Sequence, residues 1–164
     1  MHLAQLNIAH LRAPIDSAEL AEFVALLEPI NALADAAPGF VWRLKESETD
    51  PTATVVHDYG DMLLINFSVW ESMESLWDYV YRSPHLGVLR RRREWFLRAV
   101  EPYMVMWWVP DGQIPSLAEG MERLERLRTG GPGPEAFTFK DAYTPEGRPS
   151  SEAASLPAAA EARK

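Results

Sequence analysis

The sequence predicts an α+β domain of the ferredoxin-like class, with an antiparallel sheet, the element order β-α-β-β-α-β and an additional C-terminal helix. Two observations lead to this expectation. Four segments carry strand-like runs, and apolar residues at helical spacing separate the first run from the second and the third from the fourth. The length of 164 residues, 47% of them hydrophobic, suffices for one buried core.

The first half of the pattern begins with a strand at residues 3–10. Residues 16–19 give a capping-box-like start to a helix whose apolar residues recur at helical spacing. Pro29 lies inside this helix and should kink or split it, because its ring removes one backbone hydrogen bond. A short second strand at 40–45 and a polar loop at 46–60 follow.

The second half contains the clearest strand, residues 62–70. Ser72 caps a helix, and the Ser-Pro-His sequence at 83–85 begins another that should run to residue 99. Residues 103–109 form the fourth strand, and 116–128 form the additional helix. The domain is therefore predicted to cover residues 1–140.

The C-terminal residues 141–164 have a different composition. They are rich in Pro, Glu, Ser and Ala and contain few large apolar groups. Such a segment cannot bury enough apolar surface to offset the entropy of ordering, so a disordered tail is predicted.

Alternation along the strands predicts a sheet that is apolar on both faces. The third strand places one unbroken apolar set on the face expected to lie under the helices: Leu63, Ile65, Phe67 and Val69. Its other face mixes apolar and uncharged polar residues: Met62, Leu64, Asn66, Ser68 and Trp70. A sheet of this kind needs a second layer, which another copy of the chain would supply, so a homodimer is predicted.

The polar residues Asn7, Asn66 and Ser68 would then converge on a mostly apolar pocket between the two copies, as in a ligand site. In the alternative interpretation they pair with each other inside a dry interface.

Composition excludes several classes of function. The net charge of −8 argues against nucleic-acid binding, which needs a clustered basic surface. The basic run at 90–93 spreads over every face of a helix, which favours solvated ion pairs. Without cysteine, disulfides and thiolate chemistry are absent, and the remaining histidines have no metal-like spacing. No signal peptide or membrane-length apolar run occurs, so a cytoplasmic protein without membrane contact is predicted.

His85 is the best titratable candidate for catalysis. A helix start disfavours imidazolium, so a neutral ring near pH 7 could accept a proton from a substrate. Its alternative role is a hydrogen bond at a helix junction. Asn7 and Asn66 could polarise a substrate oxygen, or they could satisfy one another as buried strand residues.

Five further residues are candidates for substrate binding. Trp70, Trp42 and Trp107 could stack on a planar ligand, although tryptophans also simply fill cores. Tyr81 flanks the Ser-Pro-His turn. Arg82 could clamp a carboxylate or form a surface ion pair. No phosphate loop, nucleophile elbow or zinc-protease helix is present.

Several motifs carry a family resemblance. Residues 66–76, which include Trp-Glu-Ser, and the later Tyr-Arg-Ser-Pro-His at 81–85 resemble the antibiotic-biosynthesis-monooxygenase group of the dimeric α/β-barrel superfamily. The phrases at 4–7, 38–43, 107–110 and 136–139 resemble more closely the DUF3291 proteins, a bacterial family of that superfamily. The resemblance implies a dimeric α/β barrel. It leaves the function open, because oxygenases, heme degraders, isomerases and binding proteins share this fold.

We therefore expect a small-molecule enzyme that works without a cofactor. It would oxygenate, isomerise or cyclise an apolar substrate, aromatic or polyketide-like, whose own carbanion reacts. One alternative is a heme- or ligand-binding homodimer without turnover, since heme degraders of the superfamily use an Asn, a Trp and a His on the elements that here carry Asn7, Trp70 and His85. The spacing from Trp70 to His85 is longer than in those enzymes. A purely structural interaction module is the other alternative.

Overall fold

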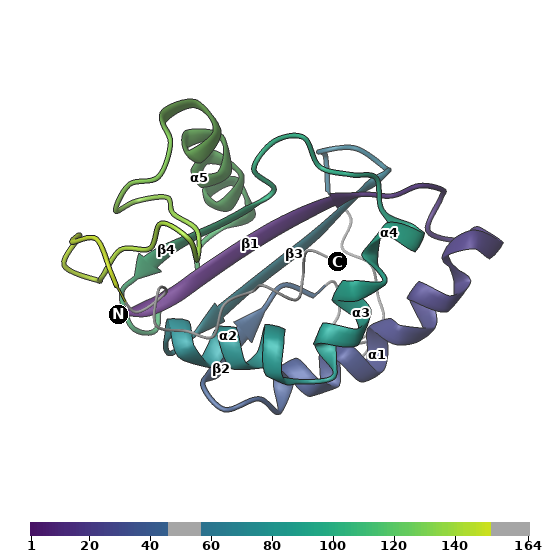
Figure 1. Cartoon of the computed structure of the whole chain (residues 1–164), viewed down its shortest axis with the longest axis horizontal. Coiled ribbons are helices and arrows are strands. Elements are labelled where there is room, and N and C mark those ends of the chain that lie inside the picture. Colours follow the sequence, from purple (N-terminus) through teal and green to yellow (C-terminus); the bar gives the residue numbers. More distant parts are fainter. Residues whose placement is uncertain (46–56, 152–164) are drawn as a thin grey trace.

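Four strands form an antiparallel sheet in the order β2-β3-β1-β4 in the computed structural model, which describes residues 1–45 and 57–151. The central strands are β1 (His2–His10) and β3 (Leu63–Trp70), and the outer ones are β2 (Phe40–Arg43) and β4 (Met104–Val109). Helical connections join β1 to β2 and β3 to β4, as Figure 1 shows. This is the ferredoxin-like arrangement, so the predicted fold class is confirmed.

The helices follow the predicted order with shifted ends. They are the 3-10 turn η1 (Ala18–Leu20), α1 (Ala21–Asp35), α2 (Met73–Arg82), α3 (His85–Arg90), α4 (Arg92–Trp95) and α5 (Leu117–Gly130). Ser72 and Ser116 cap α2 and α5, because each hydroxyl accepts a hydrogen bond from the backbone N–H three residues later, at 3.1 Å.

Two helix predictions need correction. Pro29 does not split α1, which continues as one helix with this proline on its exposed side. The helix expected to reach residue 99 ends at Trp95, after a break at Arg91. Phe96 is extended, and the Leu97 N–H donates to the His10 carbonyl at 2.8 Å, so the chain here follows the end of β1.

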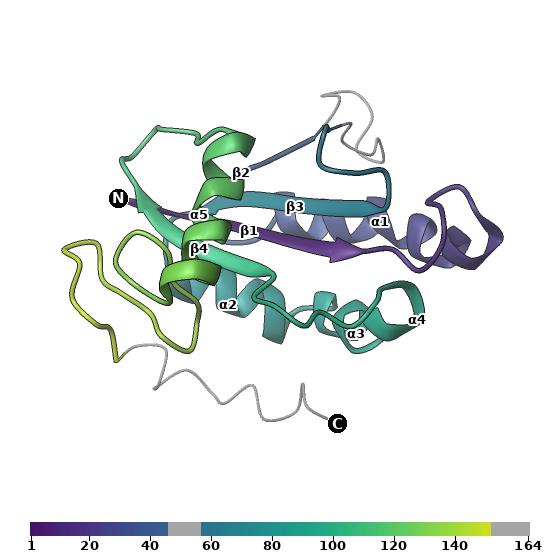
Figure 2. The same cartoon turned by 90° about the horizontal axis from the view of Figure 1, so that it is seen from above.

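The two faces of the sheet are covered by different helices, with α5 on one side and α1–α4 on the other (Figure 1). The face under α5 is entirely apolar, and we call it the apolar face: Leu6, Ile8, Ile65, Phe67, Val105 and Trp107. Figure 2 shows α5 lying across β4. The closest approach is at Gly120, where an added Cβ would lie 2.6 Å from Leu6 Cδ1.

This arrangement reverses the predicted assignment of the faces. The set containing Ile65 and Phe67 was expected under the helices that connect the strands, but it lies under α5, and the set containing Asn66 and Ser68 faces α1–α4. Both sets contain enough apolar residues to be buried, so strand periodicity could not distinguish them.

The physical argument for a homodimer changes as well. The residues of the apolar face are at most 7% exposed within a single chain. This face therefore needs no second copy to keep it from water, and the homodimer stays a prediction without that support.

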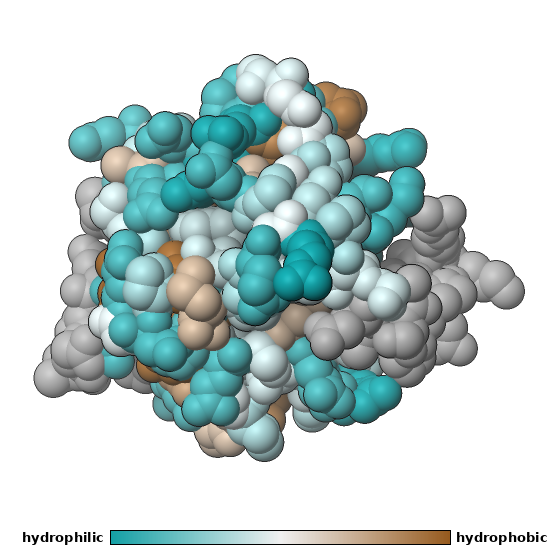
Figure 3. Space-filling model, turned by 90° about the vertical axis from the view of Figure 1, so that its left-hand side faces the viewer, coloured by the Kyte–Doolittle hydropathy of each residue, from teal (hydrophilic) through white to brown (hydrophobic). Residues whose placement is uncertain are grey.

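The predicted tail begins too early. Phe137 pairs with Met106 through two backbone hydrogen bonds, the Trp108 indole N–H donates to the Tyr143 carbonyl at 2.7 Å, and Ala142 is 3% exposed. These contacts pack the chain up to Tyr143 against β4, and the Ser150 N–H donates to the Ala142 carbonyl at 2.8 Å. Residues 152–164 lie outside the described part. The adjoining side of the molecule is mostly hydrophilic, with small scattered apolar groups (Figure 3). Across residues 1–45 and 57–151, no helix combines the length and apolar character needed to cross a membrane.

Candidate functional site

The face of the sheet under α1–α4 has a polar centre. Gln5 lies opposite Ser68 and Asn7 lies opposite Asn66, in two successive cross-strand pairs of β1 and β3. We call these four residues the polar ladder. At one end Trp70 packs with α2, and at the other end Leu64 packs with residues of α1 and α4. The ladder is therefore an uncharged polar strip between two apolar clusters.

A chain of hydrogen bonds runs through the ladder. The Trp70 indole N–H donates to Ser68 Oγ at 2.9 Å, and Ser68 Oγ donates to Gln5 Oε1 at 3.2 Å. Gln5 Nε2 then donates to Asn7 Oδ1 at 2.9 Å. The side chains are thus held in fixed orientations before any ligand binds.

The hydrogen-bond chain ends at Asn7, beside Asn66. Asn66 is solvent-exposed and Asn7 is half-buried. Within the described residues, neither the Asn66 amide nor the Asn7 Nδ2 group has a hydrogen-bond partner. Two amide groups are therefore available to a molecule placed against the centre of the sheet.

An aromatic row extends from the ladder towards α3. Phe40 meets the Trp70 ring edge-on at 5.5 Å between centroids, and Tyr79 stacks on Trp70 at 5.2 Å. The His85 ring lies against Tyr79 at 4.9 Å. Burial raises the pKa of Tyr79 far above its ordinary value, and its hydroxyl donates to the Ile30 carbonyl at 3.3 Å. Tyr79 is thus a neutral spacer between the indole and the imidazole.

His85 is held at the start of α3 by two hydrogen bonds to residues before it in the chain. Its backbone N–H donates to Ser83 Oγ at 3.1 Å, although α3 begins one residue later than predicted, with Pro84 and not Ser83 at its N-cap. Burial lowers the pKa of the His85 imidazole, and the hydrogen bond with the Val80 carbonyl raises it by a smaller amount. That carbonyl is 3.3 Å from Nδ1 and can only accept, so Nδ1 carries the proton and Nε2 keeps a free lone pair. The predicted direction of the pKa shift holds, but desolvation, not the helix dipole, is its main cause.

Trp42 and Trp107 lie away from the polar ladder and the aromatic row. Both belong with the residues of the apolar face, where Trp42 meets Phe67 at 5.5 Å and Trp107 meets it at 5.7 Å. The Trp107 indole N–H donates to Glu119 Oε1 at 3.2 Å, which ties β4 to α5. Trp70 and Trp107 therefore lie on opposite faces of the sheet and cannot shape one pocket.

Tyr81 and Arg82 point away from the aromatic row. The Tyr81 ring packs on Trp77 at 4.2 Å and near Phe139, and burial raises its pKa. Arg82 pairs with Asp78 at 2.9 Å with about half of each side chain exposed, at 53% and 43%. This matches the surface ion pair that was the alternative interpretation of Arg82.

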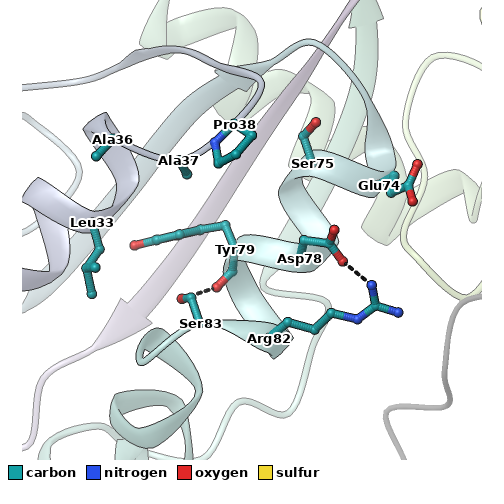
Figure 4. Close-up of a pocket in the computed structure, with 10 residues that line it drawn as sticks. All are labelled: Leu33, Ala36, Ala37, Pro38, Glu74, Ser75, Asp78, Tyr79, Arg82 and Ser83. Atoms are coloured by element: carbon teal, nitrogen blue, oxygen red, sulfur yellow. Dashed lines mark hydrogen bonds and ion pairs between the residues drawn. The ribbon is translucent and has the colours of Figure 1, made fainter.

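A separate groove of about 460 Å³ lies between the end of α1 and α2 (Figure 4). Its walls are Leu33, Ala36, Ala37, Pro38, Glu74, Ser75, Asp78, Tyr79, Arg82 and Ser83. Tyr79 belongs to both places, since one side stacks on Trp70 while the other lines the groove. The groove lacks unpaired amides like those of the ladder, so the ladder is the better candidate for chemistry.

Two residues of the site were not predicted from the sequence. Gln5 connects Ser68 to Asn7, and Tyr79 connects Trp70 to His85. Gln5 shares a strand face with Asn7 by the two-residue period, which is a signal that could have found it. Nothing in the helical pattern distinguishes Tyr79 from the other aromatic residues of α2.

Metal and heme ligation have little support in this geometry. In the described part of the chain, no three His, Asp or Glu side chains group as a metal site would require. For heme, Trp70 would have to contact the macrocycle, but it is 1% exposed and covered by Phe40 and Tyr79. The arrangement of Asn7, Trp70 and His85 therefore does not fit the heme-degrading constellation.

The fold and the ladder together define a ferredoxin-like α+β domain with an amide-bearing sheet face. The chain belongs to the family described as Domain of unknown function (DUF3291), whose sequence profile matches residues 2–153. The predicted family is thereby confirmed. No curated protein matches the sequence.

Three solved structures are similar to this chain, each over 70% of its length. One is SnoaB, a cofactor-independent oxygenase from Streptomyces nogalater, with 17% identity, a TM-score of 0.45 and 98% of that chain covered. Another is NE2512, a protein of unknown function from Nitrosomonas europaea, with 16% identity, a TM-score of 0.46 and 95% of that chain covered. The third is the monooxygenase ActVA-Orf6 of Streptomyces coelicolor in complex with the ligand Nanaomycin D, with 18% identity, a TM-score of 0.41 and 92% of that chain covered. These similarities do not identify functional residues of this chain.

Proposed function

We propose that the chain is a small-molecule enzyme whose polar ladder holds an oxygen atom of a planar, mostly apolar substrate while His85 transfers a proton. The proposal needs no cofactor. It covers oxygenation by dioxygen and, as its second form, isomerisation or cyclisation of the same kind of substrate.

One observation carries the proposal: two amides without partners among the described residues lie in the polar ladder, between two apolar clusters of the same sheet face. Beside these apolar clusters, an amide N–H donor would stabilise an oxygen that gains negative charge during reaction, once the substrate has displaced the water that reaches the exposed Asn66. In a purely structural strip water would satisfy the exposed Asn66, but a half-buried amide such as Asn7 Nδ2 would be expected to find a partner within the protein, as Gln5 and Ser68 do.

His85 supplies the base. The free Nε2 lone pair would take a proton from a C–H or O–H next to the substrate oxygen, and the electron pair left behind would delocalise onto that oxygen near Asn7 and Asn66. A neutral imidazole at pH 7 is required for this step, and burial of His85 favours that form. Tyr79 and Trp70 set the position of His85 relative to the ladder.

The anion can then react in two ways. With dioxygen, a methylene flanked by aromatic rings becomes a carbonyl: one oxygen atom enters the product, and the other leaves as water with the two hydrogens. Without dioxygen, the anion is reprotonated at another carbon or attacks a carbonyl of the same molecule, which gives isomerisation or cyclisation.

Anthrone, a planar tricyclic ketone with an acidic methylene, tests both forms. Deuterium exchange at the methylene under nitrogen measures proton transfer, and anthraquinone formed in air measures oxygenation. We expect His85→Ala to slow both rates by about 100-fold, the usual contribution of a general base. Exchange without anthraquinone would assign the isomerase or cyclase form.

His10→Ala is the matched control, since His10 is exposed at the end of β1. This variant should retain both rates. Equal rates in the parent protein, in His85→Ala and in buffer would refute the proposed role of the site.

A further inference from the structure

We infer that Gln5 is a positioning residue that turns the Asn7 amide so that its NH2 group faces the ligand. The site would therefore select molecules that present a hydrogen-bond acceptor, such as a ketone, a quinone or an enolate, over molecules that present a donor. This inference rests on the proposed function and specifies its substrate class.

The hydrogen-bond chain has a direction, which is set by the donor and acceptor of each of its bonds. An indole N–H is a donor only, so Ser68 Oγ must accept from Trp70 at 2.9 Å. In the structure the Gln5 amide presents its oxygen to Ser68, and the Ser68 hydroxyl donates its one proton to that oxygen at 3.2 Å. With its carbonyl oxygen turned to Ser68, Gln5 presents its NH2 group to Asn7.

The last step fixes the chemistry of the open end. Gln5 Nε2 donates to Asn7 at 2.9 Å, and only the Asn7 oxygen can accept it. The Asn7 Nδ2 group is then directed away from Gln5 and has no partner among the described residues. A half-buried donor without a partner favours a ligand oxygen and disfavours a ligand N–H or O–H donor.

The role of Gln5 is specific to its amide. A glutamate at this position could still accept from Ser68, but it has no N–H for Asn7. Its second oxygen would attract the Asn7 NH2 group and repel the Asn7 oxygen, so the Asn7 amide should turn and present its oxygen instead. Gln5→Glu therefore reverses the polarity of the site without changing its shape.

Side-chain amide NMR tests the chain in the protein without ligand. We expect the bonded Gln5 Nε2 proton to exchange with solvent more slowly than the amide protons of exposed Asn66. Ser68→Ala and, independently, Trp70→Phe should shift the Gln5 and Asn7 amide resonances and reduce that protection. If both variants leave these resonances unchanged, the directional chain is refuted.

A matched pair of planar probes tests the selectivity. Fluorenone carries a carbonyl that fluorene lacks, and the two hydrocarbon frames are alike. The parent protein should bind fluorenone about threefold to tenfold more tightly than fluorene, the usual net worth of one hydrogen bond, with a lowered carbonyl stretching frequency in the infrared. In Gln5→Glu the preference and the frequency shift should both disappear.

Gln113→Glu is the control, because it makes the same charge change at an exposed turn after β4. It should behave as the parent protein does. Equal affinity for both probes in the parent would overturn the inference while leaving an aromatic site intact. If neither probe binds, the proposed function fails, and the amide resonances still decide the direction of the hydrogen-bond chain.

Discussion

The two faces of the sheet are made from alternate residues of the same strands, yet they differ in how completely their groups are satisfied. On the apolar face, α5 covers the strands so closely that Phe67 and Trp107 are 3% and 1% exposed. On the ladder face, α1–α4 leave Asn66 exposed between two apolar clusters. Residues 66 and 67 are neighbours in the chain but belong to these two different environments.

The difference separates stability from function within one strand pair. Burial of apolar area drives folding in proportion to the area removed from water, and every residue of the apolar face contributes to it. The ladder face gives up part of that contribution for polar groups that are ordered but not all paired. Such an exception to local consistency is expected where a site has a task besides folding.

The largest effect should come from shortening a residue of the apolar face. Phe67→Ala leaves a cavity between Leu6, Trp42 and Trp107 and should lower the free energy of unfolding by about 3–5 kcal/mol. Asn66→Ala, one position away, should change it by less than about 0.5 kcal/mol, since the side chain is exposed. Urea unfolding of both variants measures the contrast. Similar losses in both would show that the faces are not divided as described.

A second effect should appear where α5 meets the sheet. Gly120→Val places carbon atoms within reach of Leu6 Cδ1 and Trp107, so the helix must move outward, at a cost of about 1–3 kcal/mol. Gly130→Val is the control in the same helix, because an added Cβ there meets nothing within 4 Å. Thermal unfolding should show a lowered Tm for the first variant only. An unchanged Tm would mean that α5 is not seated tightly on the sheet.

A smaller loss of stability, equal for the two faces, should follow when the N-cap of a helix on either face is removed. Ser116→Ala on α5 and Ser72→Ala on α2 each remove one hydrogen bond to a helix N–H and should cost about 1 kcal/mol. Ser17→Ala is the control, because the Ser17 hydroxyl makes no capping bond. Chemical denaturation compares the three. A loss confined to one cap would indicate that the two helices contribute unequally to cooperative folding.

The sequence predicted the order of the elements because each one has a local signal. The Ser72 and Ser116 caps and the two-residue alternation in β3 depend on neighbours in the chain. The same alternation placed Asn7, Asn66 and Ser68 together on one face. These are consequences of backbone periodicity, and they hold whichever helix covers the strands.

What the sequence could not predict depends on tertiary contacts. Which face α5 covers follows from its contact with Leu6 at Gly120, and no local pattern records that contact. For this reason the sequence could not show that Trp42 and Trp107 lie on the face opposite Trp70, since tryptophans occur on both faces. The direction of the ladder depends on the Trp70 indole meeting Ser68, a matter of side-chain orientation.

The smallest predicted effect concerns pH and the ladder face alone. Burial holds the pKa of His85 in the folded protein below its ordinary value of 6.5. Well above pH 6.5 the imidazole is neutral in both states and contributes no pH dependence. As the pH falls below 6.5 the unfolded chain binds a proton that the folded protein does not, so stability decreases until the pH reaches the lower, folded pKa.

His85→Gln removes this titration while keeping an uncharged polar side chain. The parent protein should therefore lose stability between pH 6.5 and the folded pKa of His85 more steeply than the variant does. Because the other histidines are common to both proteins, the difference between the two denaturation series isolates His85. Parallel series would mean that the imidazole is hydrated in the folded protein, and the neutral base that we propose for His85 would then lack its physical cause.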